Sequence, residues 1–125
     1  MKRILVIDDE APVRRMLRQT LEYAGYTVVE AEDGKEGLKQ YRAEPADLVI
    51  TDILMPEKEG LETIRELRRE FPETKIIAIS GGGRSGVLDF LNVAEKLGAH
   101  RTFHKPFSLQ DLLTAIRELL ETEKS

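Results

Sequence analysis

Polar side chains that could bind a cation or a phosphate stand at the ends of four of the five strand-like runs in this sequence. Asp8 and Asp9 follow the first run, and Asp52 follows the third. Ser80 follows the fourth run, and Lys105 follows the fifth. Carboxylates, a hydroxyl and an ammonium group that meet at one place could together hold a divalent cation and a phosphoryl group.

Whether these side chains meet depends on the elements that carry them. Short β-branched runs alternate with stretches of helical periodicity, and Gly25 and Asp33 supply a helix stop and a helix cap. Ser108 begins a capping-box-like sequence before the last helix. The predicted strands cover residues 3–8, 26–31, 47–51, 75–79 and 101–104.

Strands that alternate with helices predict an α/β domain of the (βα)5 type, a doubly wound five-stranded parallel sheet with helices on both faces. Right-handed crossovers leave few topologies, and strand order 2-1-3-4-5 is the common solution. The switch point of this order lies between the first and third strands, at their carboxyl ends. Asp8, Asp9 and Asp52 should therefore flank one site.

Three carboxylates at one sheet edge repel, because two unit charges about 5 Å apart at an effective dielectric near ~20 cost roughly 3 kcal/mol. A raised pKa or a bound cation relieves this repulsion. An all-oxygen ligand set favours Mg²⁺. Asp52 could then act as a nucleophile toward phosphorus, with Lys105 and Ser80 contacting the phosphoryl oxygens. A simpler interpretation of Asp9 alone is a helix cap, and of Ser80 alone a turn residue.

Composition narrows the class of protein. The chain has 125 residues, 41% of them hydrophobic, which fits one domain with a polar tail at residues 121–125. Its net charge is −4 and no basic stripe stands out, so we expect no direct nucleic-acid binding. No stretch approaches the roughly 20 apolar residues of a membrane helix. The first apolar run is also too short for a signal segment, so we expect a cytoplasmic protein. The absence of cysteine excludes disulfides but does not fix the compartment.

The same residues carry a family resemblance that spans about residues 3–120. The motifs are Asp8-Asp9, Asp52 with Met55-Pro56 and Gly60, Ser80, and Lys105-Pro106-Phe107. Together they resemble the receiver domain of bacterial two-component response regulators. The resemblance implies a flavodoxin-like receiver fold, a single stand-alone receiver over residues 1–125, and a switch operated by phosphorylation rather than an enzyme with its own substrate.

The resemblance also implies roles for residues around the acidic site. Asp52 accepts a phosphoryl group from a sensor histidine kinase or a phosphotransfer protein. Asp9 and Asp52 bind Mg²⁺ directly, Asp8 binds it through water, and the carbonyl of Leu54 is a further ligand.

Other implied roles concern the phosphoryl group and the output. Ser80 and Lys105 engage the phosphoryl group, and the Lys105–Pro106 peptide is cis. The only chemistry is self-phosphotransfer and autodephosphorylation, and the signal passes by protein contacts to a downstream target from a monomer or weak dimer.

The chain departs from the family pattern at two places. The family usually has an aromatic residue three positions before the lysine, where this sequence has Thr102. Phe103 should point to the opposite face of its strand. The segment that begins Gly81-Gly82-Gly83 is glycine-rich, and we hypothesise that it orders around the phosphoryl group.

Three rival interpretations use the same residues. Gly81, Gly83 and Gly86 match the G-x-G-x-x-G motif of dinucleotide-binding domains, but no acidic residue ends the next strand. A phosphatase of the haloacid dehalogenase type would need an acid at position 54, where Leu54 stands. A degenerate receiver that acts as a constitutive docking module is the third alternative, and the complete set of site residues argues against it.

Overall fold

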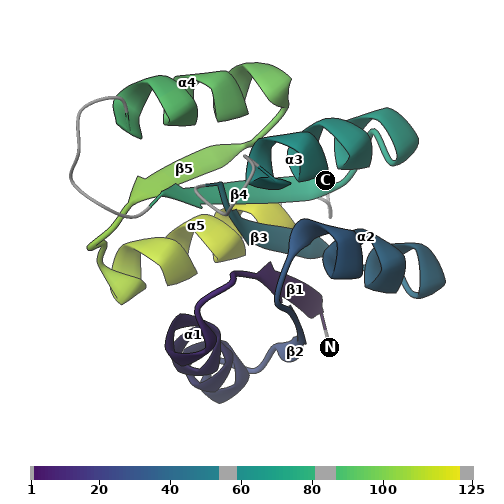
Figure 1. Ribbon diagram of the computed structural model, residues 1–125. Coiled ribbons are helices and arrows are strands. Elements are labelled where there is room, and N and C mark those ends of the chain that lie inside the picture. The colour runs from purple at the N-terminus through teal and green to yellow at the C-terminus, as the bar shows by residue number, and fades with distance from the viewer. Residues whose placement is uncertain (1, 54–58, 81–86, 122–125) are drawn as a thin grey trace.

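The computed structural model describes residues 2–53, 59–80 and 87–121, which form one five-stranded parallel sheet with helices on both faces (Figure 1). The strand order is β2-β1-β3-β4-β5, as the alternating pattern predicted. The strands are β1 (Arg3–Ile7), β2 (Thr27–Ala31), β3 (Leu48–Asp52), β4 (Lys75–Ser80) and β5 (Arg101–His104). The helices are α1 (Ala11–Tyr23), α2 (Gly34–Ala43), α3 (Glu59–Glu70), α4 (Val87–Leu97) and α5 (Leu109–Glu121).

Local sequence signals fix several helix ends. The side chain of Asp33 accepts a hydrogen bond from the N–H of Glu36 at 2.8 Å and so caps α2. Ser108 caps α5 in the same way, because its Oγ accepts from the N–H of Asp111 at 3.1 Å. Gly25 follows α1 with a φ of 101°, a conformation that side chains disfavour, and it ends that helix as predicted.

The sheet separates two hydrophobic cores. Side chains of α2, α3 and α4 pack with one set of strand residues, and side chains of α1 and α5 pack with the other. Figure 1 shows α3 and α4 on one side of the sheet and α1 and α5 on the other. Alternate residues of β1 enter different cores, Ile4 one and Leu5 the other. Burial on both faces explains why these strands are continuous apolar runs.

Arg68 of α3 ties together three segments at the amino-terminal side of the sheet. Its Nη2 donates to the carbonyl of Thr74 at 3.0 Å and to the carbonyl of Gly98 at 2.7 Å. Its Nη1 donates to the carbonyl of Pro72. Burial lowers the pKa of Arg68, although a guanidinium stays charged at any physiological pH. The side chain therefore satisfies carbonyl groups that follow α3 and α4.

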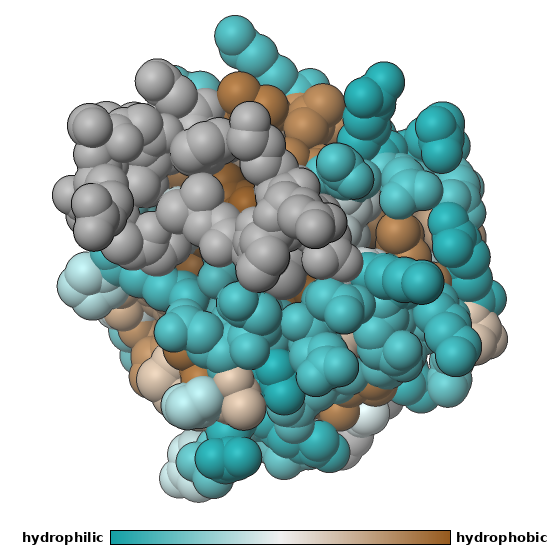
Figure 2. Space-filling view, viewed as in Figure 1, coloured by the Kyte–Doolittle hydropathy of each residue, from teal (hydrophilic) through white to brown (hydrophobic). Residues whose placement is uncertain are grey.

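Figure 2 shows one face of the molecule by hydropathy. Figure 2 shows mostly hydrophilic residues on the face viewed in Figure 1, with smaller apolar areas between them. Within the described residues, no helix is long and apolar enough to cross a membrane. Helix α5 continues through Glu121, the first residue of the predicted polar tail, and residues 122–125 lie outside the described part of the chain.

We expect Arg68→Ala to lower the free energy of unfolding by about 1–3 kcal/mol, because it leaves partly buried carbonyl groups without a donor. Urea denaturation monitored by circular dichroism measures this change. The neighbouring Arg69 is the matched control. Its side chain is 68% exposed and lies 3.8 Å from Glu66, so Arg69→Ala should cost less than about 0.5 kcal/mol. Equal losses in the two variants would contradict the assigned role of Arg68.

Candidate functional site

Backbone pairing beyond the strands holds the predicted site residues at one edge of the sheet. The N–H of Asp8 donates to the carbonyl of Ala31 at 3.1 Å, which extends the β1–β2 ladder past the end of β1. The N–H of Lys105 donates to the carbonyl of Ser80 at 2.7 Å, which does the same for β4 and β5. Asp52 is the last residue of β3. All four residues therefore stand where parallel strands end.

The side chain of Lys105 lies between carboxylates from two neighbouring strands. Its Nζ is 3.3 Å from Oδ2 of Asp8 and 3.3 Å from Oδ2 of Asp52. It also lies 3.4 Å from Oε1 of Glu10. Asp8 is 1% exposed and Asp52 is 5% exposed, so the ion pairs are shielded from water. The structure thus brings together Asp8, Asp52 and Lys105 from distant parts of the sequence.

Burial and neighbouring charges set the proton affinities at this site. Burial raises the pKa of the Asp8 carboxyl from 3.8 to about 6, and repulsion from Asp52 adds to the rise. The N–H of Glu10 and the ammonium of Lys105 act in the opposite direction. Burial of Lys105 disfavours its charge, but Asp52 and Asp8 outweigh burial and raise the pKa of Lys105 above its ordinary value. The ammonium form of Lys105 therefore persists at neutral pH.

Ser80 contributes a buried hydroxyl to the same edge. The residue is 0% exposed, and its Oγ has no hydrogen-bond partner among the described residues. An unpaired buried hydroxyl costs about 1–3 kcal/mol, so such groups are rare and need an explanation. A phosphoryl oxygen at the end of β3 would supply the missing partner.

The donor set fits a hard divalent cation. Asp8, Glu10 and Asp52 each offer a carboxylate oxygen, and the three oxygens lie within 4.8 Å of one another. Such oxygen donors suit Mg²⁺. Asp9 is exposed and is not one of the three, so its direct ligation of Mg²⁺ stays a prediction. Leu54, with its predicted carbonyl ligand, lies outside the described residues.

Glu10 is the residue that sequence reasoning missed. It is the N-cap of α1, and its N–H donates to Oδ1 of Asp8 at 2.9 Å. Asp9 therefore does not cap this helix, and the simpler interpretation of that residue is wrong. The available signal was the run of three acids after β1, which places a third carboxylate one residue beyond the expected pair.

Gly60 brings α3 against the end of β3. A Cβ at this position would overlap the carbonyl oxygen of Asp52 and the Cα of Ile53, both of which belong to backbone that cannot rotate away. Only glycine allows this approach. The first turn of α3 is therefore seated directly on the residue predicted to accept the phosphoryl group.

The last strand and its exit carry two further predicted features. Phe103 belongs to the core of α1 and α5 and lies 5.7 Å from Phe107 between ring centroids, so it points away from the face of Thr102, as alternation predicted. The Lys105–Pro106 peptide is cis, as the resemblance implied. The glycines Gly81, Gly82, Gly83 and Gly86 lie outside the described residues.

We expect Asp8→Asn to stabilise the metal-free protein at about pH 7 by up to roughly 3 kcal/mol. Between about pH 4 and about pH 6 the folded protein keeps the Asp8 proton that the unfolded chain has lost, so wild-type stability falls as the pH rises through this window. Below about pH 4 the two proteins should match.

Chemical denaturation in a metal chelator across this pH range measures the difference. Asp9→Asn is the control, because Asp9 is exposed and its substitution should change stability little at any pH. A loss of stability in Asp8→Asn at about pH 7 would contradict the expected cost of burying this charge.

Comparison with known proteins identifies the family of this chain. The family model of the response regulator receiver domain matches residues 4–117. The response regulator MprA of Mycobacterium ulcerans (strain Agy99) is 37% identical over 122 residues, which cover 98% of this chain and 51% of that protein. The chain spans about half the length of the curated relatives it matches.

Solved structures agree in fold along the whole chain. The response regulator receiver domain protein from Clostridium thermocellum superposes with a TM-score of 0.90 at 34% identity, covering 99% of this chain and 98% of that one. The response regulator protein TrrA from Thermotoga maritima, solved in complex with Mg(2+)-BeF, gives 0.84 at 36% identity, covering 96% and 100%. This chain belongs to the response regulator receiver domain family, the phosphorylation-regulated signalling modules of two-component systems.

Proposed function

We propose that this receiver domain is switched by transfer of a phosphoryl group to Asp52 from a phosphohistidine of a sensor histidine kinase or phosphotransfer protein. A carboxylate oxygen of Asp52 forms the bond to phosphorus as the bond from phosphorus to the histidine nitrogen breaks. Attack of water on phosphorus later releases inorganic phosphate and restores the carboxylate. The observation that carries this proposal is the pairing of a buried Asp52 with Lys105 beside the unsatisfied hydroxyl of Ser80.

Each of these groups has a task as negative charge collects on the phosphoryl oxygens. The ammonium of Lys105 already lies 3.3 Å from Asp52 and can neutralise an oxygen bound there. The hydroxyl of Ser80 can donate to a second oxygen. Mg²⁺, when bound by Asp8, Glu10 and Asp52, would offset the charge of the carboxylates and of the incoming group. Its presence in the Thermotoga maritima relative supports this assignment.

The proposal also gives roles to residues that the contacts described above do not connect to the acidic site. Asp9 and the carbonyl of Leu54 complete the proposed Mg²⁺ ligands. The switch is proposed to involve Thr102, Pro106 and the segment that begins Gly81-Gly82-Gly83. The resulting change is read by a downstream protein, because phosphorylation shifts a conformational equilibrium only as far as its differential contacts allow.

Incubation with acetyl phosphate and Mg²⁺ should add one phosphoryl group, seen as a single adduct by intact mass spectrometry. Asp52→Asn should abolish the adduct because the acceptor oxygen is replaced by an amide, and a chelator should also abolish it. No adduct and no Mg²⁺ binding in the wild type would contradict the proposal and favour a constitutive docking module. Asp9→Asn and Glu10→Gln, assayed for Mg²⁺ affinity, identify which acid ligates beside Asp52.

Ser80→Ala should slow formation of the adduct by roughly tenfold or more, because it removes a donor to the phosphoryl oxygens. Ser80→Thr is the matched control, since it keeps the hydroxyl on a β-branched residue that suits a strand. The same substitution to alanine should leave stability unchanged or raise it, because the hydroxyl has no described partner to lose. Equal phosphorylation rates in the alanine variant and the wild type would remove Ser80 from the site.

A further inference from the structure

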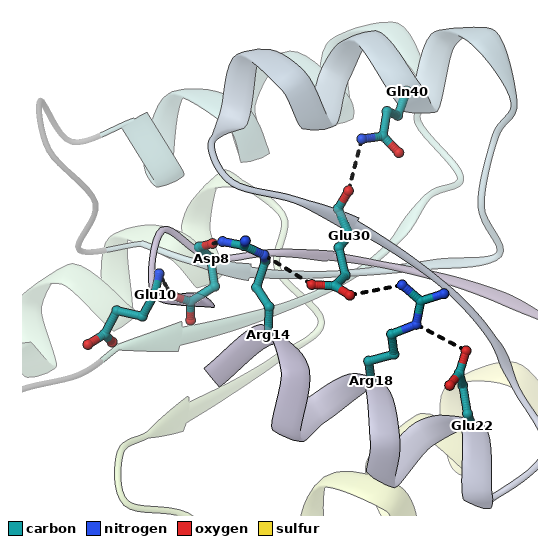
Figure 3. Close-up of polar contacts among 7 residues, drawn as sticks. All are labelled: Asp8, Glu10, Arg14, Arg18, Glu22, Glu30 and Gln40. Carbon is teal, nitrogen blue, oxygen red and sulfur yellow. Dashed lines mark hydrogen bonds and ion pairs between the residues drawn. The ribbon is translucent and has the colours of Figure 1, made fainter. Parts of the chain in front are cut away.

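A chain of hydrogen bonds and ion pairs links the backbone of Asp8, at the end of β1, to Glu22 on α1 (Figure 3). Arg14 donates from Nη1 to the backbone carbonyl of Asp8 at 2.6 Å and from Nε to Oε1 of Glu30 at 3.2 Å. Arg18 donates to the other oxygen of Glu30 at 2.9 Å and to Glu22 at 3.1 Å. Arg14 alone among these side chains contacts the site residue Asp8.

Three hydrogen bonds hold Asp8, two at its main chain and one at its side chain. Its N–H donates to Ala31 of β2, its carbonyl accepts from Arg14, and its carboxylate accepts from the N–H of Glu10. Arg14 is only 16% exposed, so its bond to the carbonyl is shielded from water. The guanidinium bridges two acceptors in a fixed fork, which a flexible ammonium cannot do equally well. The segment that carries Asp8, Asp9 and Glu10 is thereby fixed before any cation arrives.

We propose that Arg14 is a positioning residue of the cation site: it acts through the backbone of Asp8 and keeps the acidic segment in the geometry that binds Mg²⁺. This inference rests on the proposed function, because it concerns the same site. Glu30 holds the guanidinium of Arg14 in place. Hydrogen bonds from Arg18 and, to a lesser extent, Arg14 lower the pKa of Glu30, so this carboxylate stays ionised at neutral pH. Residues that hydrogen-bond to metal ligands without touching the metal typically contribute about 10–100-fold to metal affinity.

The first test needs no metal. Hydrogen exchange of the Asp8 and Glu10 amides is measured by NMR in the metal-free protein, for the wild type, Arg14→Gln and Arg18→Gln. Arg14→Gln should accelerate exchange of both amides by about tenfold or more, because the segment loses one anchor. Arg18→Gln is the matched control, since Arg18 shares Glu30 but does not contact Asp8, and it should leave both amides near the wild-type rate. Unchanged exchange in Arg14→Gln overturns the inference.

The second test measures Mg²⁺ affinity by calorimetry. Arg14→Gln should bind Mg²⁺ about tenfold more weakly or worse, whereas Arg18→Gln should bind it within about twofold of the wild type. Arg14→Lys keeps the positive charge but lacks the two-pronged guanidinium, so it should recover only part of the Mg²⁺ affinity that Arg14→Gln loses. Wild-type affinity in Arg14→Gln, or full rescue by lysine, overturns the inference. A wild type that binds no Mg²⁺ overturns the proposed function instead, and the exchange test still decides the role of Arg14.

Discussion

Two carboxylates from neighbouring strands are buried side by side, and one ammonium group lies between them. Asp8 and Asp52 are almost inaccessible to water, and each lies 3.3 Å from Lys105. Without a cation the repulsion between two shielded carboxylates would be severe, and the raised pKa of Asp8 reflects its burial first and this repulsion second. The arrangement requires that β1, β3 and β5 all end at the same edge of the sheet, which the parallel topology provides. The ammonium of Lys105 can therefore offset the charges of Asp8 and Asp52 only because the strand order brings the three residues to one edge.

The elements around this centre act mainly through the backbone. Arg14 contacts the carbonyl of Asp8, and Gly60 lets α3 rest on the carbonyl of Asp52. The hydrogen bond from the N–H of Lys105 to the carbonyl of Ser80 keeps the backbones of these two residues side by side at the ends of β4 and β5. The side chains proposed to act at this site are thus carried on main-chain positions that have little freedom. Preorganisation of this kind lowers the cost of arranging charged groups when a ligand arrives.

The sequence alone was enough to predict the sheet, because the hydrophobic periodicity and the residues that end helices indicate the same element boundaries. Gly25, Asp33 and Ser108 mark helix ends where the structure has them, and the strand ends carry the acids and the lysine. The supporting contacts were not predictable in the same way. Glu10 joins the cluster because its place as the N-cap of α1 brings one of its carboxylate oxygens within 4.8 Å of those of Asp8 and Asp52. Arg14 bonds Glu30, which lies sixteen residues away in the sequence. Propensity and spacing describe one element at a time, whereas these contacts depend on how a helix rests on a strand.

The bond from Gln40 to β2 has a consequence for how this molecule behaves at high concentration. β2 is one outer strand of an open sheet, and such strands can recruit a second chain through their unpaired backbone groups. The side-chain amide of Gln40 donates a hydrogen bond to the carbonyl of Glu30 at 2.9 Å (Figure 3). The strand therefore has one unpaired acceptor fewer for a second chain. The opposite outer strand, β5, has only four residues. Its first residue, Arg101, and its last, His104, are both exposed. Both borders of the sheet thus discourage the strand-to-strand association that leads to aggregates.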